Sequence, residues 1–184
     1  AGCVWGGIRG RSLMVRGRLA CLAGACWDVG GSARDRPVDA LIGGRMNARI
    51  RAYTYLYPQS HHPRPAFWAD ADMAAESAVA MVEKGYTAVK FDPAGPYTMR
   101  GGHMPSMHDI STSVTFCKAI RDAVGNRADL LFGTHGQFST AGAIRMGQAL
   151  EPYSPLWYEE PTPPDADMGR VCDAVRTPVA PAER

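Results

Sequence analysis

The sequence predicts an α/β protein built on a parallel sheet. Short apolar runs alternate with longer segments whose apolar residues recur at helical spacing. Such alternation is typical of parallel strands joined by helices that pack outside the sheet. A second observation is that successive apolar runs end in ionisable side chains. We therefore expect five strands, four intervening helices and a cluster of polar groups at one edge of the sheet.

The expected strands are short apolar runs bounded by proline, glycine or polar residues. They are residues 50–57, 86–91, 129–132, 155–158 and 178–181. The expected helices between them are residues 70–84, 109–124, 139–150 and 165–175. Ser139 or Thr140 should cap the third helix. In the first, second and fourth of these helices, the residues expected to face inward lie on one helical stripe. They are Ala74, Ala78, Met81 and Val82, then Ile110, Val114, Cys117 and Val124, and then Met168, Val171, Cys172 and Val175.

The first 45 residues are less regular. Residues 1–17 have no clear period, whereas residues 19–33 carry small and apolar side chains through several turns and predict a buried helix. Residues 37–44 predict a short helical turn closed by a glycine pair. The connection at 93–108 is long for a loop between a strand and a helix, which is typical of active-site loops.

Composition excludes several classes of function. The chain is 46% hydrophobic with a formal net charge of +2, and it has no basic run, so we expect no nucleic-acid partner. No stretch approaches the roughly 20 apolar residues of a membrane helix, and the start lacks the layout of a signal peptide. Five scattered cysteines argue against a disulfide framework or a zinc site. A reduced, cytoplasmic setting is expected.

Polar residues end four of the five expected strands. Lys90 and Asp92 close the second, His135 follows the third, Glu159 ends the fourth and Glu183 ends the fifth. His135 and Glu159 are separated by 24 positions, as are Glu159 and Glu183. Because this spacing is about one strand–helix unit, the groups should lie at the same height on neighbouring strands. The carboxyl ends of parallel strands are where such sheets bind ligands.

The types of residue at these positions restrict the chemistry. Side chains alternate along a strand, so Glu159 should face the site and Glu160 should point away. Carboxylates held close together repel unless a cation lies between them, and oxygen ligands suit Mg²⁺. A lysine beside such a cation loses its proton more readily than a free one. A metal with a positioned base can take a proton from a carbon next to a carboxylate.

Several segments resemble mandelate racemase/muconate lactonizing enzyme-like members of the enolase superfamily. They are GACWDVGGSARDRPVDALIGG at 24–44, TAVKFDP at 87–93, GTHGQF at 133–138, LWYEEPTPP at 156–164 and PVAPAER at 178–184. The likeness is greatest to the acid-sugar dehydratases, which remove water from a sugar acid. It implies that Glu159 and Glu183 bind Mg²⁺, with Mn²⁺ as an alternative. It also implies that Lys90 lies at the substrate α-carbon and that His135 is an acid–base group.

Three departures from the family pattern bear on these roles. Gly133 stands where the first metal carboxylate is usual, and His135 could fill that place, although nitrogen suits Mn²⁺ or Fe²⁺ better than Mg²⁺. Asp92 replaces the second lysine of many racemases. The chain also holds only about half of the eight units of a complete barrel.

These features lead to a prediction of domain organisation. Residues 1–45 are expected to be the end of an N-terminal capping region with its linker helix. Residues 46–184 are expected to form the first half of a (β/α) TIM-type barrel, truncated and inactive by itself. The full-length protein is expected to be a homo-oligomer that acts on a small sugar acid.

Alternative functions remain open from the sequence. A racemase, epimerase or cycloisomerase of the same superfamily would share the metal and the proton abstraction but release no water. An aldolase-type barrel would use Lys90 to form a Schiff base. A non-catalytic fragment that has lost its metal site is the alternative from another class. The histidines at 61, 62, 103 and 108 are interpreted as solvated loop residues.

Overall fold

The computed structural model of the 184-residue chain describes residues 13–92, 102–163 and 168–181. The chain divides into two compact units, residues 1–50 and 51–184, which are considered separately. The first unit holds helix α1, Leu13–Ser32, and the short helix α2, Val38–Leu41. Backbone N–H of Gly44 donates to the Asp39 carbonyl at 2.7 Å and closes α2 as the glycine pair predicts.

The prediction that the first helix is buried is wrong for its described side chains. Leu22, Trp27 and Val29 of α1 are 46–67% exposed. Its apolar residues are not gathered on one stripe, and the described part of the first unit offers only the short helix α2 to cover them. The helix also begins six residues earlier than the predicted residue 19.

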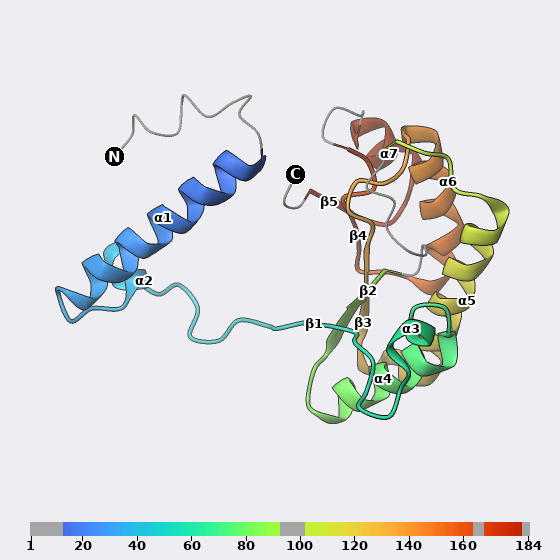
Figure 1. Cartoon of the computed structure of the whole chain (residues 1–184), viewed down its shortest axis with the longest axis horizontal. Helices are drawn as coiled ribbons and strands as arrows, with labels where there is room; N and C mark the ends of the chain where they lie inside the picture. The colour runs from blue at the N-terminus through green and yellow to red at the C-terminus, as the bar shows by residue number, and fades with distance from the viewer. Residues whose placement is uncertain (1–12, 93–101, 164–167, 182–184) are drawn as a thin grey trace. The chain divides into compact units, whose positions relative to one another are not determined.

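The second unit contains a five-stranded parallel sheet whose strand order follows the sequence (Figure 1). Its strands are β1 Thr54–Tyr55, β2 Ala88–Phe91, β3 Asp129–Gly133, β4 Trp157–Glu159 and β5 Val179–Ala180. The parallel sheet is therefore confirmed. The first strand is shorter than the predicted 50–57, because only Thr54 and Tyr55 pair with β2.

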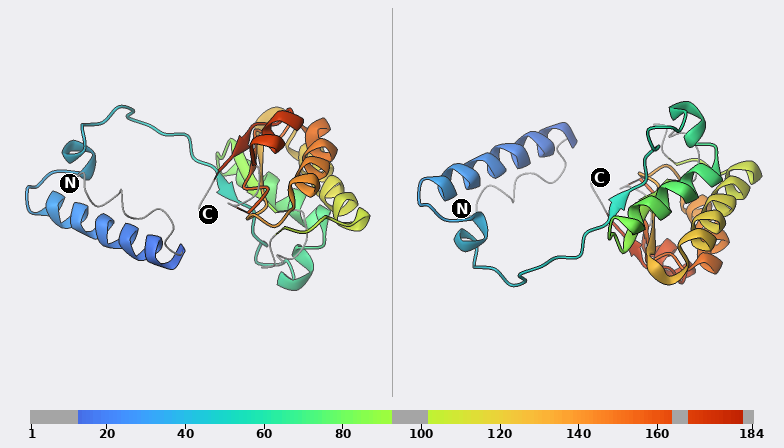
Figure 2. Two further views of the ribbon diagram at one scale, coloured as in Figure 1. Left: turned by 90° about the horizontal axis from the view of Figure 1, so that it is seen from above. Right: turned by 90° about the horizontal axis from the view of Figure 1, so that it is seen from below.

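Helices connect the strands and lie on one side of the sheet, as Figures 1 and 2 show. They are α3 Arg64–Phe67, α4 Ala71–Glu83, α5 Met107–Val124, α6 Thr140–Leu150 and α7 Met168–Ala174, with 3₁₀ turns at Gly125–Arg127 and Glu151–Tyr153. Helix α3 lies between the predicted strand 50–57 and the predicted helix 70–84, where we expected a loop. None of the described helices combines the length and apolar character needed to cross a membrane.

Side-chain caps fix where the longer helices begin. Asp70 accepts hydrogen bonds from the backbone of Asp72 and Met73 at the start of α4. Ser106 and Asp109 form a reciprocal capping box that starts α5 two residues before the predicted boundary. Ser139 accepts from Gly142 N at 3.2 Å, so the predicted cap of α6 is confirmed.

The hydrophobic core lies between the sheet and these helices. Alternate strand residues enter it, namely Val89, Phe91, Leu130, Phe132 and Tyr158, all at most 4% exposed. The predicted helical stripes supply the other side, and Ala78, Cys117 and Val171 are at most 1% exposed. Cys172 is the exception because it is exposed. It is adjacent to Val171, and one residue rotates a helix by about 100°, which turns the Cys172 side chain out of the core.

Candidate active site

The sheet face opposite the helices carries the polar residues. Tyr55 pairs in register with Lys90, Lys90 with Leu131, and Leu131 with Trp157. Residues in register on neighbouring parallel strands project to the same face, and the core-facing residues are their chain neighbours. Tyr55, Lys90 and Trp157 therefore lie in one row on this face, with Leu131 between Lys90 and Trp157.

A second row follows two residues further along, at the carboxyl ends of the strands. Gly133 pairs with Glu159, and Glu159 pairs with Ala180. Asp92 comes directly after Phe91, whose partner is Phe132, so Asp92 lies at the height of Gly133. Three neighbouring strands thus bring Asp92, Gly133 and Glu159 to one level.

Lys90 and Glu159 form an ion pair across this face, although β3 lies between their strands. Lys90 Nζ contacts Glu159 Oε1, and the two side chains are only 9% and 12% exposed. The indole Nε1 of Trp157 donates to the other carboxylate oxygen of Glu159 at 3.0 Å. The Lys90 ammonium also lies 5.6 Å from the centre of the Tyr55 ring, within range of a cation–π interaction. The lysine is therefore held in place on two sides.

Asp92 links the first three strands through its carboxylate. The Tyr55 hydroxyl donates to Asp92 Oδ2, and His135 Nε2 lies 3.2 Å from the same oxygen. The Asp92 side chain is 7% exposed and that of His135 is 27% exposed. This arrangement places an imidazole, partly accessible to solvent, beside a buried carboxylate.

The turn after β3 holds His135 in an uncommon backbone conformation. Its φ is +50°, and the next residue, Gly136, has φ +69°. The Thr134 hydroxyl lies within hydrogen-bonding distance of the carbonyls of Glu159 and Glu160, at 3.0 and 2.9 Å. Positive φ in a non-glycine residue costs energy and is concentrated at functional sites. The end of β4 thus holds the turn that presents His135.

Gly133 has no room for a side chain in this arrangement. A Cβ atom at this position would lie 2.7 Å from Asp92 Oδ1 and 2.9 Å from Lys90 Cε. In an aspartate at position 133, each carboxylate oxygen would lie two bonds from that Cβ. Asp92 Oδ1 therefore takes up space that such a carboxylate would use. Asp92 and Glu159 offer oxygen donors of the kind that Mg²⁺ prefers.

The structure brings together four of the five predicted site residues: Lys90, Asp92, His135 and Glu159. Glu183 and most of the predicted loop 93–108 lie outside the described residues. Sequence reasoning missed Tyr55 and Trp157. Both could have been found, since Tyr55 lies within an expected strand and Trp157 precedes Glu159 by two residues, which puts it on the same face.

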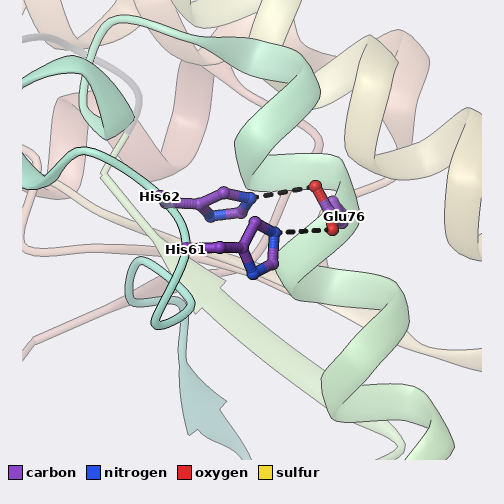
Figure 3. A group of neighbouring side chains, drawn as sticks. All are labelled: His61, His62 and Glu76. Carbon is purple, nitrogen blue, oxygen red and sulfur yellow. Dashed lines mark hydrogen bonds and ion pairs between the residues drawn. The ribbon is translucent and has the colours of Figure 1, made fainter.

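Two of the other histidines, His62 and His103, differ from their interpretation as solvated residues. His62 is 8% exposed and therefore buried. It lies with His61 against Glu76 of α4 in a second polar cluster (Figure 3). His103 is partly buried and pairs with Phe138, their ring centres 5.4 Å apart. Only His61 and His108 are exposed in the described structure.

A comparison with family models identifies the class of this protein. Residues 72–184 match the model described as enolase C-terminal domain-like. The chain belongs to this family, and its five parallel strands with alternating helices form part of the family's TIM-type barrel. Members of the enolase superfamily remove a proton next to a carboxylate, and they typically use a divalent metal such as Mg²⁺.

The chain is also similar to individual dehydratases and to a solved structure. The chain is 36% identical to a D-gluconate/D-galactonate dehydratase of Picrophilus torridus over 95% of its length, and 33% identical to a D-xylonate dehydratase of Haloferax volcanii over 86%. A crystal structure of a mandelate racemase/muconate lactonizing enzyme-like protein from Roseovarius sp. TM1035 is 72% identical, with a TM-score of 0.83 over 86% of this chain. The chain covers 42%, 38% and 41% of these three proteins, respectively.

Proposed function

We propose that this chain forms part of the active site of an acid-sugar dehydratase. The enzyme would take the proton α to the carboxylate of a sugar acid and then release the β-hydroxyl as water. The observation that carries the proposal is the meeting of Lys90, Asp92, His135 and Glu159 at the carboxyl ends of β2, β3 and β4. The dehydratase names of the relatives from Picrophilus and Haloferax support the same reaction.

Glu159, Glu183 and Asp92 would hold the divalent cation in this proposal. Glu159 is at the end of β4 and has Trp157 on one of its oxygens. Asp92 supplies through Oδ1 the oxygen that Gly133 lacks, while Tyr55 and His135 contact Oδ2 and fix the carboxylate. Such outer contacts are what orient metal ligands in proteins. When bound, the cation would supply positive charge for the oxyanion that develops as the α-proton leaves.

Lys90 is the candidate base at the α-carbon. It is 7% exposed and approaches the strand ends from the same face as Glu159. Burial of this kind excludes water from the amine and keeps its position fixed, which a proton transfer over hydrogen-bond distance requires. The Tyr55 ring lies beside Lys90 Nζ on the β1 side.

His135 is the candidate acid for the departing hydroxyl. Asp92 Oδ2 faces its Nε2, which leaves Nδ1 as the nitrogen directed away from Asp92. A protonated His135 would then donate from Nδ1 to the leaving oxygen. Asp92 acts here through His135 as well as through the cation, and both roles predict that it is essential.

The remaining parts of the proposal concern the complete protein. Residues 1–45 would belong to a capping region and residues 46–184 to the first half of the barrel, and the loop at 93–108 would contact the sugar chain. The full-length protein would be a homo-oligomer. Each of these assignments needs a complete barrel before it can be tested.

The experiment is a chimera in which this chain replaces its matching segment in the Roseovarius protein. The purified chimera with Mg²⁺ is offered a panel of sugar acids in D₂O, and products are followed by mass spectrometry. A dehydratase yields a product lighter by one water, and omission of Mg²⁺ abolishes the reaction. Deuterium exchange at the α-carbon without loss of water would instead indicate a racemase or epimerase. Absence of both on every acid would contradict the proposal.

A further inference from the structure

A second polar cluster lies away from the residues assigned to the proposed reaction. His61 and His62 are in the connection between β1 and α3, and Glu76 is in the second turn of α4 (Figure 3). His61 Nε2 is 2.9 Å from Glu76 Oε1, and His62 Nε2 is 2.9 Å from Oε2. Each imidazole thus contacts a different oxygen of one carboxylate. The cluster joins a loop to a helix that is separate from it in the sequence.

The loop holds His62 in a fixed position before any ligand binds. Its ring stacks on Phe67 with ring centres 6.0 Å apart. Its side chain is 4% exposed, whereas those of His61 and Glu76 are 61% and 58% exposed. The backbone of Gln59 donates to His62 Nδ1 at 3.2 Å and accepts from His62 N at 3.0 Å. One ligand is therefore rigid and buried, and two are accessible from solvent.

The three side chains offer the ligands of a transition-metal site. Two imidazole nitrogens and a carboxylate oxygen lie within 4.8 Å of one another. No other group of three or more His, Cys, Asp or Glu in the described part of the chain meets this condition. Two histidines and a glutamate form a known zinc ligand set that leaves one position for water. Imidazole suits Zn²⁺, Ni²⁺ and Cu²⁺ but not Mg²⁺.

We propose that His61, His62 and Glu76 bind a divalent transition-metal ion of the zinc class at the junction of the β1–α3 connection and α4. This site goes beyond the proposed reaction, with which it shares no residue. The bound ion would tie the connection after β1 to the middle of α4. A metal in place of the present hydrogen bonds would coordinate both Nε2 atoms and one Glu76 oxygen.

The positions of the protons in the cluster determine which hydrogen bonds metal binding must change. Because His62 Nδ1 accepts from Gln59, its proton is on Nε2, where it now points to Glu76. Metal binding at Nε2 moves this proton to Nδ1, which ends the hydrogen bond that Gln59 N–H donates to Nδ1. Hydrogen bonds from His62 and His61 lower the pKa of the Glu76 carboxyl below its usual range, so it is ionised at neutral pH. With its proton on Nδ1, His62 accepts the ion together with the ionised Glu76 and without net loss of a proton.

The test uses the whole 184-residue chain after removal of metal with EDTA and dialysis. Titration with Co²⁺ at neutral pH is followed by calorimetry and by the visible absorption of the ion. With excess Mg²⁺ present to fill the proposed carboxylate site, we expect one Co²⁺ per chain, displaced by Zn²⁺. The spectrum should lack thiolate charge-transfer bands, because the ligands are nitrogen and oxygen.

Two exposed ligands allow substitutions that spare the fold. His61→Ala and Glu76→Gln should each weaken Co²⁺ binding by about tenfold or more, since even outer-shell partners of metal sites contribute that much. His108→Ala removes an exposed histidine of α5 and should leave the affinity unchanged. Circular dichroism checks that each variant is folded. The proposal is overturned if the parent chain binds no Co²⁺, if thiolate bands appear, or if both variants bind as the parent does.

Discussion

The two histidine–carboxylate clusters of the second unit differ in exposure and in donor atoms. In the first, His135 faces Asp92, whose side chain is 7% exposed, and a buried Lys90 pairs with Glu159. In the second, His61 and His62 share Glu76, whose side chain is 58% exposed. One cluster is rich in carboxylate oxygen and contains a buried amine. The other is rich in imidazole nitrogen and lies partly in solvent.

This difference shows how the same residue types acquire different roles. A buried lysine and carboxylates at strand ends are in a site that excludes water, where proton transfer and a hard cation such as Mg²⁺ are suited. Imidazoles in the connection before α3 suit a softer ion. Burial and the choice of donor atoms therefore decide together which ion each cluster suits. Four predictions examine the contrast, beginning with the largest expected effect.

Lys90→Ala should abolish exchange of the substrate α-proton in the Roseovarius chimera. Loss of a positioned base lowers the rate by about a hundredfold or more. The measurement is deuterium incorporation followed by NMR. Lys118→Ala is the matched control, because Lys118 is an exposed lysine of α5 paired with Asp122. Exchange at the parent rate in Lys90→Ala would show that another group is the base.

Asp92→Asn should weaken binding of Mn²⁺, used as a spectroscopic substitute for Mg²⁺, by about ten- to a hundredfold. The amide keeps the shape of the side chain but loses the charge that holds both the cation and His135. Electron paramagnetic resonance of the chimera measures free Mn²⁺ without relying on activity. Asp122→Asn on α5 serves as the control. Unchanged Mn²⁺ affinity in Asp92→Asn would contradict its role as the replacement for a carboxylate at position 133.

Gly133→Ala should lower the free energy of unfolding of the chain by about 1–3 kcal/mol through overpacking. The new methyl group would meet Asp92 Oδ1 and Lys90 Cε at less than van der Waals distance. Gly24→Ala in α1 is the comparison, since a Cβ there meets nothing within 4 Å and alanine favours a helix. Urea unfolding of both variants gives the difference. Equal stability of Gly133→Ala and the parent would mean that Asp92 moves away without cost.

His62→Ala should reduce the free energy of unfolding by about 1 kcal/mol, the net value of a typical hydrogen bond. His61→Ala should change it by no more than about 0.5 kcal/mol, as for most surface substitutions. The contrast follows from the buried ring of His62 and the exposed ring of His61. Urea unfolding without metal measures both. A larger loss in His61→Ala than in His62→Ala would contradict the assigned roles of the two rings.

The sequence predicted much of the fold in the second unit because its signals are local. Apolar stripes predicted α4, α5 and α7 to within a few residues, and Ser139 caps α6 as expected. The failures have physical reasons as well. The small and apolar composition of the first helix suggested burial, but its apolar residues are not gathered on one packing face. Helix α3 directly follows Pro63 and has Pro65 in its first turn, so the prolines suggested a loop where a short helix forms.

By itself, the sequence determined the strand ends that carry ionisable groups and the spacing that puts them at one height. Lys90, Asp92, His135 and Glu159 were found because alternation along a strand and the length of one strand–helix unit are properties of local geometry. Only the tertiary structure decided which groups meet. It placed Asp92 Oδ1 over Gly133, added Tyr55 and Trp157, and joined His61 and His62 to Glu76. Such contacts depend on packing between segments distant in the chain, which no local pattern specifies.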